Sequence, residues 1–299
     1  VRTALMAADL QHVQPHWCLT PVQVRRSVLQ SLPAAITFLC ADHATHPLVV
    51  KPPQQCASRG VRIVRTWDAV ATALEHAAQY GDEVLIEEYL TGTEHSAELL
   101  LDGDGKPLWF NVVDRVFSYE DGVPLERGHI NPSRLALLQQ DTIRRMLLRC
   151  AKALDVHWGP FKADVMWTAD GPKILECTAR LSGGFDSQGT SPLTGRDPTR
   201  ALLQFACGLP VDAPLGPAQR YAACAAILPD KTGRLVALAP AWRGEEEVIW
   251  TVAPGAVLGP LAHNAQRPGF VLAAAPTYAT AWSRAHAAAD ALAAAVEVG

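Results

Sequence analysis

The sequence predicts a mixed α/β fold of the α+β kind, in which most strands pair antiparallel. Short β-prone segments follow one another directly, without the regular alternation of strand and helix that a doubly wound parallel sheet requires. Longer segments have the apolar spacing of amphipathic helices, most clearly 67–80, 132–154 and 280–296. The chain of 299 residues is long enough to form two or three lobes around a large buried core.

The first part of the chain is expected to form short strands and three helices. Apolar spacing predicts a helix over 1–13 that stops before Pro15, and Thr20 is expected to cap a second helix with Pro21 in its first turn. The third helix is Trp67–Tyr80. The expected strands are His16–Leu19, Pro47–Lys51, Val61–Val64, Glu83–Leu90 and Glu94–Leu101, with a polar loop over 54–60.

The rest of the chain continues this pattern. Trp109–Val116 and Ser118–Pro124 are β-like, Asn131 is expected to cap a helix over Pro132–Leu154, and Thr199–Cys207 is a helix that ends at Gly208. Four strands are expected before the final helix, namely Tyr221–Leu228, Val248–Thr251, Val257–Leu258 and Phe270–Ala274. The stretch 209–217, rich in proline and glycine, is the clearest boundary, and the expected domains are 1–90, 91–210 and 211–299.

Composition excludes several classes of function. With 49% hydrophobic and 19% charged residues, the chain has the composition of a soluble globular protein. Its net charge of −4 creates no basic field, so neither nucleic acid nor an anionic membrane is an expected partner, and no apolar run reaches the length of a bilayer span. No secretory signal is recognisable at its start. The seven cysteines are scattered and lack a CxxC pair, which favours reduced thiols in a cytoplasmic protein.

One predicted hairpin places two acidic residues on neighbouring strands. Lys162–Trp167 and Lys173–Cys177 are short and β-prone, and they are joined by an Asp-Gly turn over 169–172. Side chains equally far from the turn face each other, so Asp164 and Glu176 are expected to lie side by side. Two carboxylates repel unless a cation lies between them, and Mg²⁺ is the usual cation where phosphates are near. An ordinary surface hairpin is the alternative interpretation.

Two further segments are able to bind a nucleotide. A strand that ends at Lys51 precedes the polar loop with Ser58-Arg59-Gly60, which offers charges and backbone N–H groups to phosphates. Glu87 closes another strand and Glu94 follows across a turn, so a purine can be read by the extended backbone and ribose hydroxyls by a carboxylate. Each segment alone also fits a solvated hairpin or an acidic strand edge.

The order of these segments resembles the ATP-grasp superfamily, on the motifs PLVVKP (47–52), SRGV (58–61), VLIEEYLTGTE (84–94) and ILECTARLSGG (174–184). The resemblance covers about residues 1–210, and more loosely the remainder. It implies the ATP-grasp fold, in which two α+β lobes clasp the nucleotide, followed here by a small C-terminal α/β lobe. It also implies that ATP and Mg²⁺ are the cofactors and that a carboxylate is activated as an acyl phosphate.

The resemblance implies a role for each matching position. Lys51 would contact the phosphates, the 54–60 loop would close over them, Glu87 would hold adenine, and Glu94 would bind ribose. The residues expected to bind the nucleotide are Lys51, Ser58, Arg59, Gly60, Glu87, Glu88, Tyr89, Leu90 and Glu94. The expected metal ligands are Asp164, Glu176 and Thr178. Arg180 would stabilise the charge that develops on the transferred phosphoryl group.

Three departures from the family bear on these expectations. Thr178 stands where the family usually has asparagine, so the third metal contact is expected to be weaker or supplied by water. The 54–60 loop is poorer in glycine than is usual. The first phosphate-binding lysine and the α/β domain that normally precede these lobes would lie before Val1, so we expect this pre-ATP-grasp domain to be absent from the chain.

The segment Glu126–Ser133 resembles a loop of carboxylate–amine ligases such as the bacilysin-type L-amino acid ligases. In this interpretation His129 orients the substrate or takes the proton of an attacking ammonium near neutral pH, and Glu126 receives the amine or helps to bind a second metal. A loop histidine that is hydrogen-bonded only to backbone is the alternative. Arg115 and Arg127 are candidates for binding a substrate carboxylate.

The expected function is an ATP-dependent ligase that joins a small-molecule carboxylate to an amine and releases ADP and phosphate. One alternative is an ATP-grasp enzyme that uses bicarbonate, similar to biotin carboxylases and carbamoyl phosphate synthases. A second alternative, from another class, is a non-catalytic ATP-binding module or fragment, which Thr178 and the glycine-poor loop favour. The oligomeric state is left open, with a homodimer among the alternatives.

Overall fold

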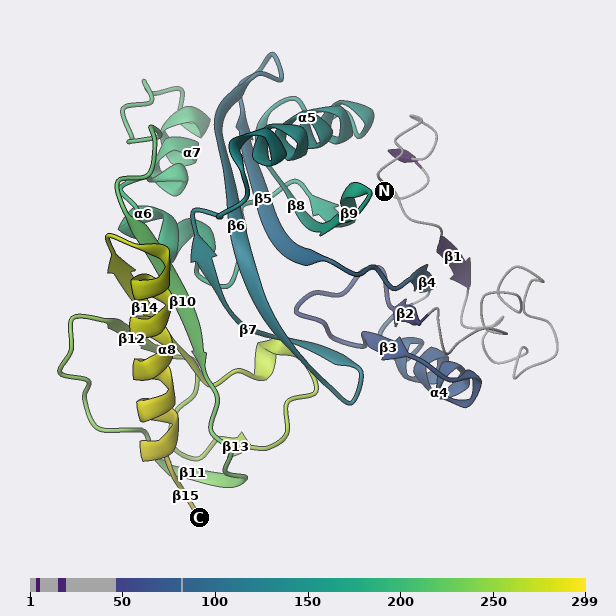
Figure 1. The fold of residues 1–299 in the computed structure, drawn as a ribbon, viewed down its shortest axis with the longest axis vertical. Helices are drawn as coiled ribbons and strands as arrows, with labels where there is room; N and C mark the ends of the chain where they lie inside the picture. The colour runs from purple at the N-terminus through teal and green to yellow at the C-terminus, as the bar shows by residue number, and fades with distance from the viewer. Residues whose placement is uncertain (1–3, 6–15, 20–46, 82) are drawn as a thin grey trace.

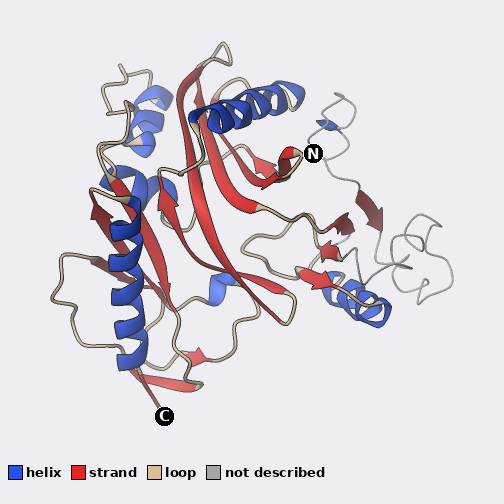
Figure 2. Cartoon of the chain, in the orientation of Figure 1, coloured by secondary structure: helices blue, strands red, loops and turns tan. Residues whose placement is uncertain are grey.

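The computed structural model describes residues 4–5, 16–19, 47–81 and 83–299. Strands dominate the fold, and helices lie at the edges and over the faces of the sheets (Figure 2). The two helices predicted over 1–13 and after Thr20 fall almost wholly outside the described residues. Among the helices that the structure describes, none has the length and apolar character needed to cross a bilayer.

A small antiparallel sheet forms the N-terminal lobe, with strand order β1-β4-β2-β3. Its strands are β1 (His16–Leu19), β2 (Leu48–Lys51), β3 (Arg62–Val64) and β4 (Val84–Glu88). Helix α4 (Trp67–Ala77) packs on this sheet through Val70, Leu74 and Ala77, which contact apolar residues of β2 and β4. Each of these elements lies where the sequence predicts it, within a few residues at the ends.

A large antiparallel sheet forms the centre of the fold, with strand order β12-β14-β10-β7-β6-β5-β8-β9 (Figure 1). The middle of the chain supplies β5 (Thr93–Leu101), β6 (Pro107–Glu120), β7 (Val123–Asn131), β8 (Gly159–Thr168) and the edge strand β9 (Gly171–Thr178). The C-terminal part of the chain adds β10 (Tyr221–Ile227), β12 (Glu247–Trp250) and β14 (Gly269–Ala275). Strands from both sides of the predicted boundary at 209–217 therefore share one sheet.

The two faces of the large sheet are covered differently. One face packs on α5 (Leu137–Ala153) and α8 (Tyr278–Ala295), with Leu99 and Phe161 among the buried residues beneath α5. On the other face, the π-helix η1 (Asp186–Thr190), α6 (Ser191–Leu193) and α7 (Pro198–Ala206) cover one end. The remainder of that second face lines a cavity.

A third, smaller sheet has the order β13-β11-β15, made of β11 (Gly233–Ala237), β13 (Val257–Leu258) and β15 (Glu297–Val298). The short 3₁₀ helix η2 (Asn264–Gln266) lies between β13 and β14. β11 and β15 were not expected from the sequence, because each is short and carries little apolar alternation.

The predictions were wrong between residues 118 and 136. Asp121 and Gly122 both have positive φ, 48° and 75°, and they form the turn between β6 and β7. The predicted piece Ser118–Pro124 therefore spans a hairpin turn, and the predicted loop around His129 is a strand. Asn131 does not cap a helix, because its backbone pairs with Ala222 of β10; α5 begins only at Leu137.

A β-bulge at Arg127 shapes the middle of β7. Val116 pairs with Gly128 whereas Phe117 pairs with Glu126, so Arg127 is the extra residue. In a regular strand, Glu126 and His129 would point to opposite faces, since side chains alternate. The bulge brings both onto the face that lines the cavity.

Replacing Gly128 by alanine is expected to destabilise the fold by about 3 kcal/mol or more. A Cβ at this position would lie 2.1 Å from the carbonyl oxygen of Cys224 on β10, and backbone in the middle of a sheet cannot move aside. Urea unfolding measures the effect, with Gly103→Ala as control because a Cβ there would meet open space. Equal stability of the two variants would contradict this account of the sheet.

Candidate active site

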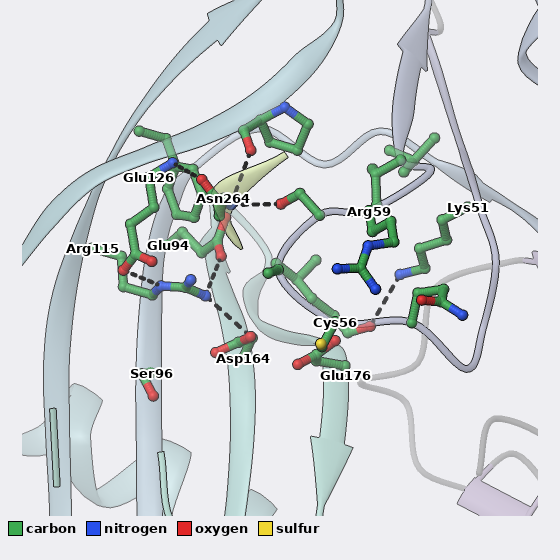
Figure 3. Close-up of a pocket in the computed structure, with 18 of the residues that line it drawn as sticks. Lys51, Cys56, Arg59, Glu94, Ser96, Arg115, Glu126, Asp164, Glu176 and Asn264 are labelled. Carbon is green, nitrogen blue, oxygen red and sulfur yellow. Dashed lines mark hydrogen bonds and ion pairs between the residues drawn. The ribbon is translucent and has the colours of Figure 1, made fainter. Parts of the chain in front are cut away.

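A cavity of about 1000 Å³ lies between the small sheet and the second face of the large sheet. Figure 3 shows Lys51, Cys56 and Arg59 on its loop side, with Arg115 and Glu126 across from them. The cavity collects segments that are far apart in the chain, from β2 and its following loop through β5–β9 to η2.

The acidic pair predicted on the hairpin is confirmed, and a bulge makes it possible. Asp164 of β8 pairs with Glu176 of β9, whereas the next pair toward the turn is Val165 with Ile174. Leu175 is therefore an extra residue, and without it Asp164 would face Leu175. At this bulge the Leu175 carbonyl accepts a hydrogen bond from Lys51 Nζ at 3.3 Å.

Two cationic side chains neutralise this acidic pair. Lys162 Nζ lies 2.6 Å from Asp164 Oδ1 and 3.4 Å from Glu176 Oε1, and Arg115 Nη1 lies 3.0 Å from Asp164 Oδ2. Burial alone would raise the pKa of Asp164, but Arg115 and Lys162 outweigh it and hold the pKa well below its usual value. Asp164 is thus an anion, and it is buried, whereas Glu176 is half exposed toward the cavity.

Arg115 of β6 joins three carboxylates. Besides Asp164, its guanidinium lies 2.9 Å from Glu94 Oε1 and 3.1 Å from Glu126 Oε1. The three carboxylates raise its pKa against the lowering effect of burial. Because one positive charge is shared among three acids, burial still raises the pKa of Glu94 to about 7. Arg115 was a candidate for binding a substrate carboxylate, and the structure shows it engaged by the protein's own carboxylates.

The other end of the cavity has the groups expected to bind a nucleotide. Lys51 Nζ forms an ion pair of 2.5 Å with the buried Glu87, whose strand continues into the segment that lines the cavity up to Leu90. The Tyr89 amide donates to the Pro47 carbonyl at 3.0 Å, so this backbone group is used within the lobe. The backbone groups of Glu88 and Leu90 were also expected to contact adenine, and that role remains a prediction.

The loop between β2 and β3 borders the same end. Ser58 and Arg59 line the cavity, whereas Gly60 does not. Gly60 instead ends the loop at φ 76°, where a Cβ would lie 2.8 Å from the ring of Tyr80. Gly60 therefore allows the backbone turn at the end of the loop, whereas the side chains of Ser58 and Arg59 face the cavity. That these residues bind phosphate remains a prediction.

Glu126, His129 and Arg180 also line the cavity. Glu126 forms ion pairs with Arg115 and, at 3.2 Å, with Arg267 Nη1. Burial alone would raise the pKa of Glu126, but these two arginines lower it to about 2. Arg180 is exposed, and its Nη1 donates to the Leu181 carbonyl at 2.9 Å. Arg127 lies outside this lining and pairs with Glu120 and Ser118.

His129 differs from its expected chemistry. Burial lowers its pKa to about 4, with Arg115 and Arg267 acting in the same direction against the opposite effect of Glu126. The imidazole is therefore neutral at pH 7, and it is a weaker base than the near-neutral group expected from the sequence. A neutral ring can still accept a hydrogen bond from an ammonium and orient it.

The low pKa of His129 predicts a loss of stability in mild acid. Below pH 6.5 the unfolded chain takes up a proton at this site, whereas the folded protein does so only near pH 4. Stability should therefore fall by about 3 kcal/mol as the pH drops from 6.5 to 4. Urea unfolding across this range should show a smaller fall for His129→Gln than for the wild type; parallel curves would contradict the assignment.

The two carboxylates of the acidic pair are too few to hold Mg²⁺ alone, but they fit Mg²⁺ together with a phosphorylated ligand. Asp164 and Glu176 offer hard carboxylate oxygens, but among the described residues no group of three or more His, Cys, Asp or Glu side chains is placed to hold a metal. Mg²⁺ in nucleotide sites typically uses one or two carboxylates, phosphate oxygens and water. Thr178, the third expected ligand, is not part of the cavity lining, so its role stays a prediction.

Several lining residues were not identified from the sequence. Lys162 lies two residues before Asp164, so the alternation of the strand could have placed both on one face. Asn264 and Arg267 come from the C-terminal part of the chain and carry no local signal for the site. The cavity also includes Ser96 and Ser182, whose hydroxyl oxygens are 3.0 Å apart.

Two family models match the chain. Residues 44–188 match the ATP-grasp domain, and residues 225–297 match the L-amino acid ligase C-terminal domain 2. The first region contains the acidic hairpin and the lysine strand, and the second contains η2 with Asn264 and Arg267. Both parts of the cavity therefore lie within matched regions.

Individual proteins agree with these matches. The chain is 32% identical over 126 residues to D-alanine–D-alanine ligase of Hydrogenovibrio crunogenus, with 41% of this chain and 39% of that protein covered. It is 28% identical to carnosine synthase 1 of Gallus gallus, with 58% of this chain and 18% of that protein covered. The chain therefore spans less than half the length of these two relatives. The fold of L-amino acid ligase from Bacillus licheniformis superposes with a TM-score of 0.71 at 20% identity, covering 97% of this chain and 69% of that one.

Domain matches, relatives and fold agree with the α+β architecture and with the motifs around the cavity. Residues 44–188 therefore belong to the ATP-grasp domain family and residues 225–297 to the L-amino acid ligase C-terminal domain 2 family, and the match to D-alanine–D-alanine ligase supports the carboxylate–amine ligase branch.

Proposed function

We propose that the protein is an ATP-dependent carboxylate–amine ligase that forms an amide or peptide bond through an acyl phosphate and releases ADP and phosphate. One observation carries the proposal: a single cavity is lined by Lys51 and Glu87, by Glu126 and His129, and by the acidic pair Asp164–Glu176, which lies between Lys51 and Glu126 in the view of Figure 3. Arg180 lines the same cavity. A nucleotide beside Lys51 and an amine beside Glu126 would meet at the carboxylate to be activated. The relatives named as D-alanine–D-alanine ligase and carnosine synthase support this class of reaction.

In this proposal each end of the cavity has its own task. Lys51 and the 58–60 segment bind phosphates, Glu87 and the strand after it hold adenine, and Glu94 accepts from ribose hydroxyls. Arg180 stabilises charge on the phosphoryl group in transfer and then on the tetrahedral adduct. Glu126, as an anion, attracts the amine, and neutral His129 orients it.

Asp164 and Glu176 would hold Mg²⁺, which supplies positive charge to the phosphate oxygens when bound. The chain's own contribution here is electrostatic. Lys162 lies close to both carboxylates, and Arg115 anchors Asp164 from the opposite side. These cations keep Asp164 ionised and fixed, so that the acidic pair does not need to rearrange for phosphate to approach.

The proposal is tested by following ADP, AMP and phosphate with MgATP and a pool of L-amino acids to which D-alanine is added. ADP and phosphate should form only when amino acids are present, with a new amide product seen by mass spectrometry. Turnover that depends on bicarbonate instead would favour a carboxylase-like enzyme. Binding of MgATP with no turnover in any pool would favour the non-catalytic module, and AMP formation would exclude the acyl phosphate route.

A further inference from the structure

The loop over the nucleotide end of the cavity is fastened by a residue of the C-terminal part of the chain. The Asn264 backbone N–H donates to the Ala57 carbonyl at 2.8 Å, and its side-chain Nδ2 donates to Ser58 Oγ at 2.8 Å (Figure 3). Asn264 is separated from Ser58 by 206 positions in the sequence, and it is buried. The tip of the loop is thus attached to η2 by main chain and side chain together.

The same side chain also holds β7. Asn264 Oδ1 accepts from the Glu126 backbone N–H at 2.8 Å, and Nδ2 also lies 3.3 Å from the Pro124 carbonyl. Arg267 strengthens this connection, since its Nη1 donates to the Glu126 carbonyl at 3.1 Å and its Nε to the Asn264 carbonyl at 2.8 Å. One buried amide therefore bridges the loop and the strand that carries Glu126.

The conformation of the loop explains why it needs such a fastening. Ala57 and Ser58 have φ of 57° and 58°, a region that residues with a Cβ adopt only at a cost in free energy. Such conformations persist where surrounding contacts over-determine them. Asn264 bonds to these same two residues. Its amide also suits the position, because it donates to Ser58 and accepts from Glu126 at the same time, which a carboxylate cannot do.

We infer that Asn264 is a positioning residue that couples the 54–60 loop to Glu126, so that the nucleotide end and the amine end of the cavity are ordered together. The inference rests on the proposed function for the roles of the two ends, but the coupling itself is a property of the fold. It gives the C-terminal part of the chain a specific task in the site, namely to set the position of a loop that belongs to the N-terminal lobe.

Three variants separate the two arms of this bridge. Ser58→Ala removes only the side-chain bond of the loop arm, and Asn264→Ala removes the side-chain bonds of both arms. The double variant tests whether the two act as a unit. Gln266→Ala is the control, because Gln266 lies in the same short helix and its side chain accepts from Ala262 and His263 without contacting the loop or β7. Thermal unfolding shows that each variant is folded.

Two readouts need no substrate. Trypsin cleavage after Arg59, mapped by mass spectrometry, reports opening of the loop, and hydrogen exchange at the Glu126 amide reports the strand arm. Asn264→Ala should increase both rates by about fivefold to tenfold, as expected for the loss of one hydrogen bond in each arm. Ser58→Ala should increase the cleavage rate alone, and the double variant should match Asn264→Ala in both.

These measurements test the coupling through Asn264 separately from the proposed function. Wild-type cleavage and exchange in Asn264→Ala, equal effects in Gln266→Ala, or additive effects in the double variant would overturn the coupling. The dissociation constant of MgATP is measured on the same proteins and should rise in Asn264→Ala and Ser58→Ala. Faster cleavage with unchanged MgATP affinity would support the fastening by Asn264 and contradict the nucleotide-binding role of the loop.

Discussion

Replacing Arg180 by alanine is expected to lower kcat by about 100-fold to 1000-fold while leaving the dissociation constant of MgATP nearly unchanged. The guanidinium lines the same cavity as the acidic pair and is exposed, so it can meet charge that develops only during phosphoryl transfer. Because it forms no ion pair within the described part of the protein, its removal should not affect stability. Steady-state formation of ADP with pooled amino acids measures the effect.

Arg127→Ala is the matched control for this experiment. Arg127 is also a partly exposed arginine, but it lies outside the cavity lining and pairs with Glu120. Its variant should keep wild-type turnover. Equal losses in the two variants, or an Arg180→Ala protein with normal kcat and weaker MgATP binding, would contradict the role proposed for Arg180.

Glu176→Gln is expected to reduce turnover by at least about 100-fold and to raise the Mg²⁺ concentration needed for half-maximal activity. The substitution keeps the shape of the side chain and removes one of the two carboxylates of the acidic pair. Since this side chain is 51% exposed, the melting temperature should stay within about 2 °C of the wild type. A titration of ADP formation with Mg²⁺ separates the metal effect from a loss of folding.

Glu120→Gln serves as the control here, because Glu120 is 52% exposed and lies at the β6–β7 turn outside the cavity lining. Its Mg²⁺ dependence should equal that of the wild type. If Glu176→Gln keeps both its turnover and its Mg²⁺ requirement, the acidic pair is not the metal site.

The sequence was sufficient for the parts of the site that depend on local pattern. The strand ending at Lys51, the strand that contains Glu87 and the hairpin with Asp164 and Glu176 are all present where expected. Each is set by alternation, turn residues and length, which act over fewer than about ten residues. The ATP-grasp resemblance added their order along the chain.

Two β-bulges could not be predicted, and both orient the site. Extra residues at Leu175 and Arg127 turn Glu176 and Glu126 toward the cavity. A bulge depends on how two strands match in register, and a single sequence does not contain that information. The wrong placement of a loop at His129 has a different cause, because the Asp-Gly pair at 121–122 is a local signal for a hairpin that the sequence does contain.

Contacts between residues far apart in the sequence could not be predicted from sequence patterns either. Arg115 binds carboxylates from three other strands, and Asn264 binds a loop 206 positions earlier. The low pKa of His129 follows from burial among such partners. These features depend on the packing of whole lobes, so composition and spacing do not reveal them.

Transfer of an oxygen atom from substrate to phosphate tests the central proposal most directly. Pooled L-amino acids and D-alanine labelled with ¹⁸O in their carboxylates are incubated with MgATP and the protein, and the released phosphate is examined by mass spectrometry. An acyl phosphate intermediate predicts one ¹⁸O in the phosphate for each amide bond formed. Amide formation with unlabelled phosphate, or with AMP as the product, would contradict the account.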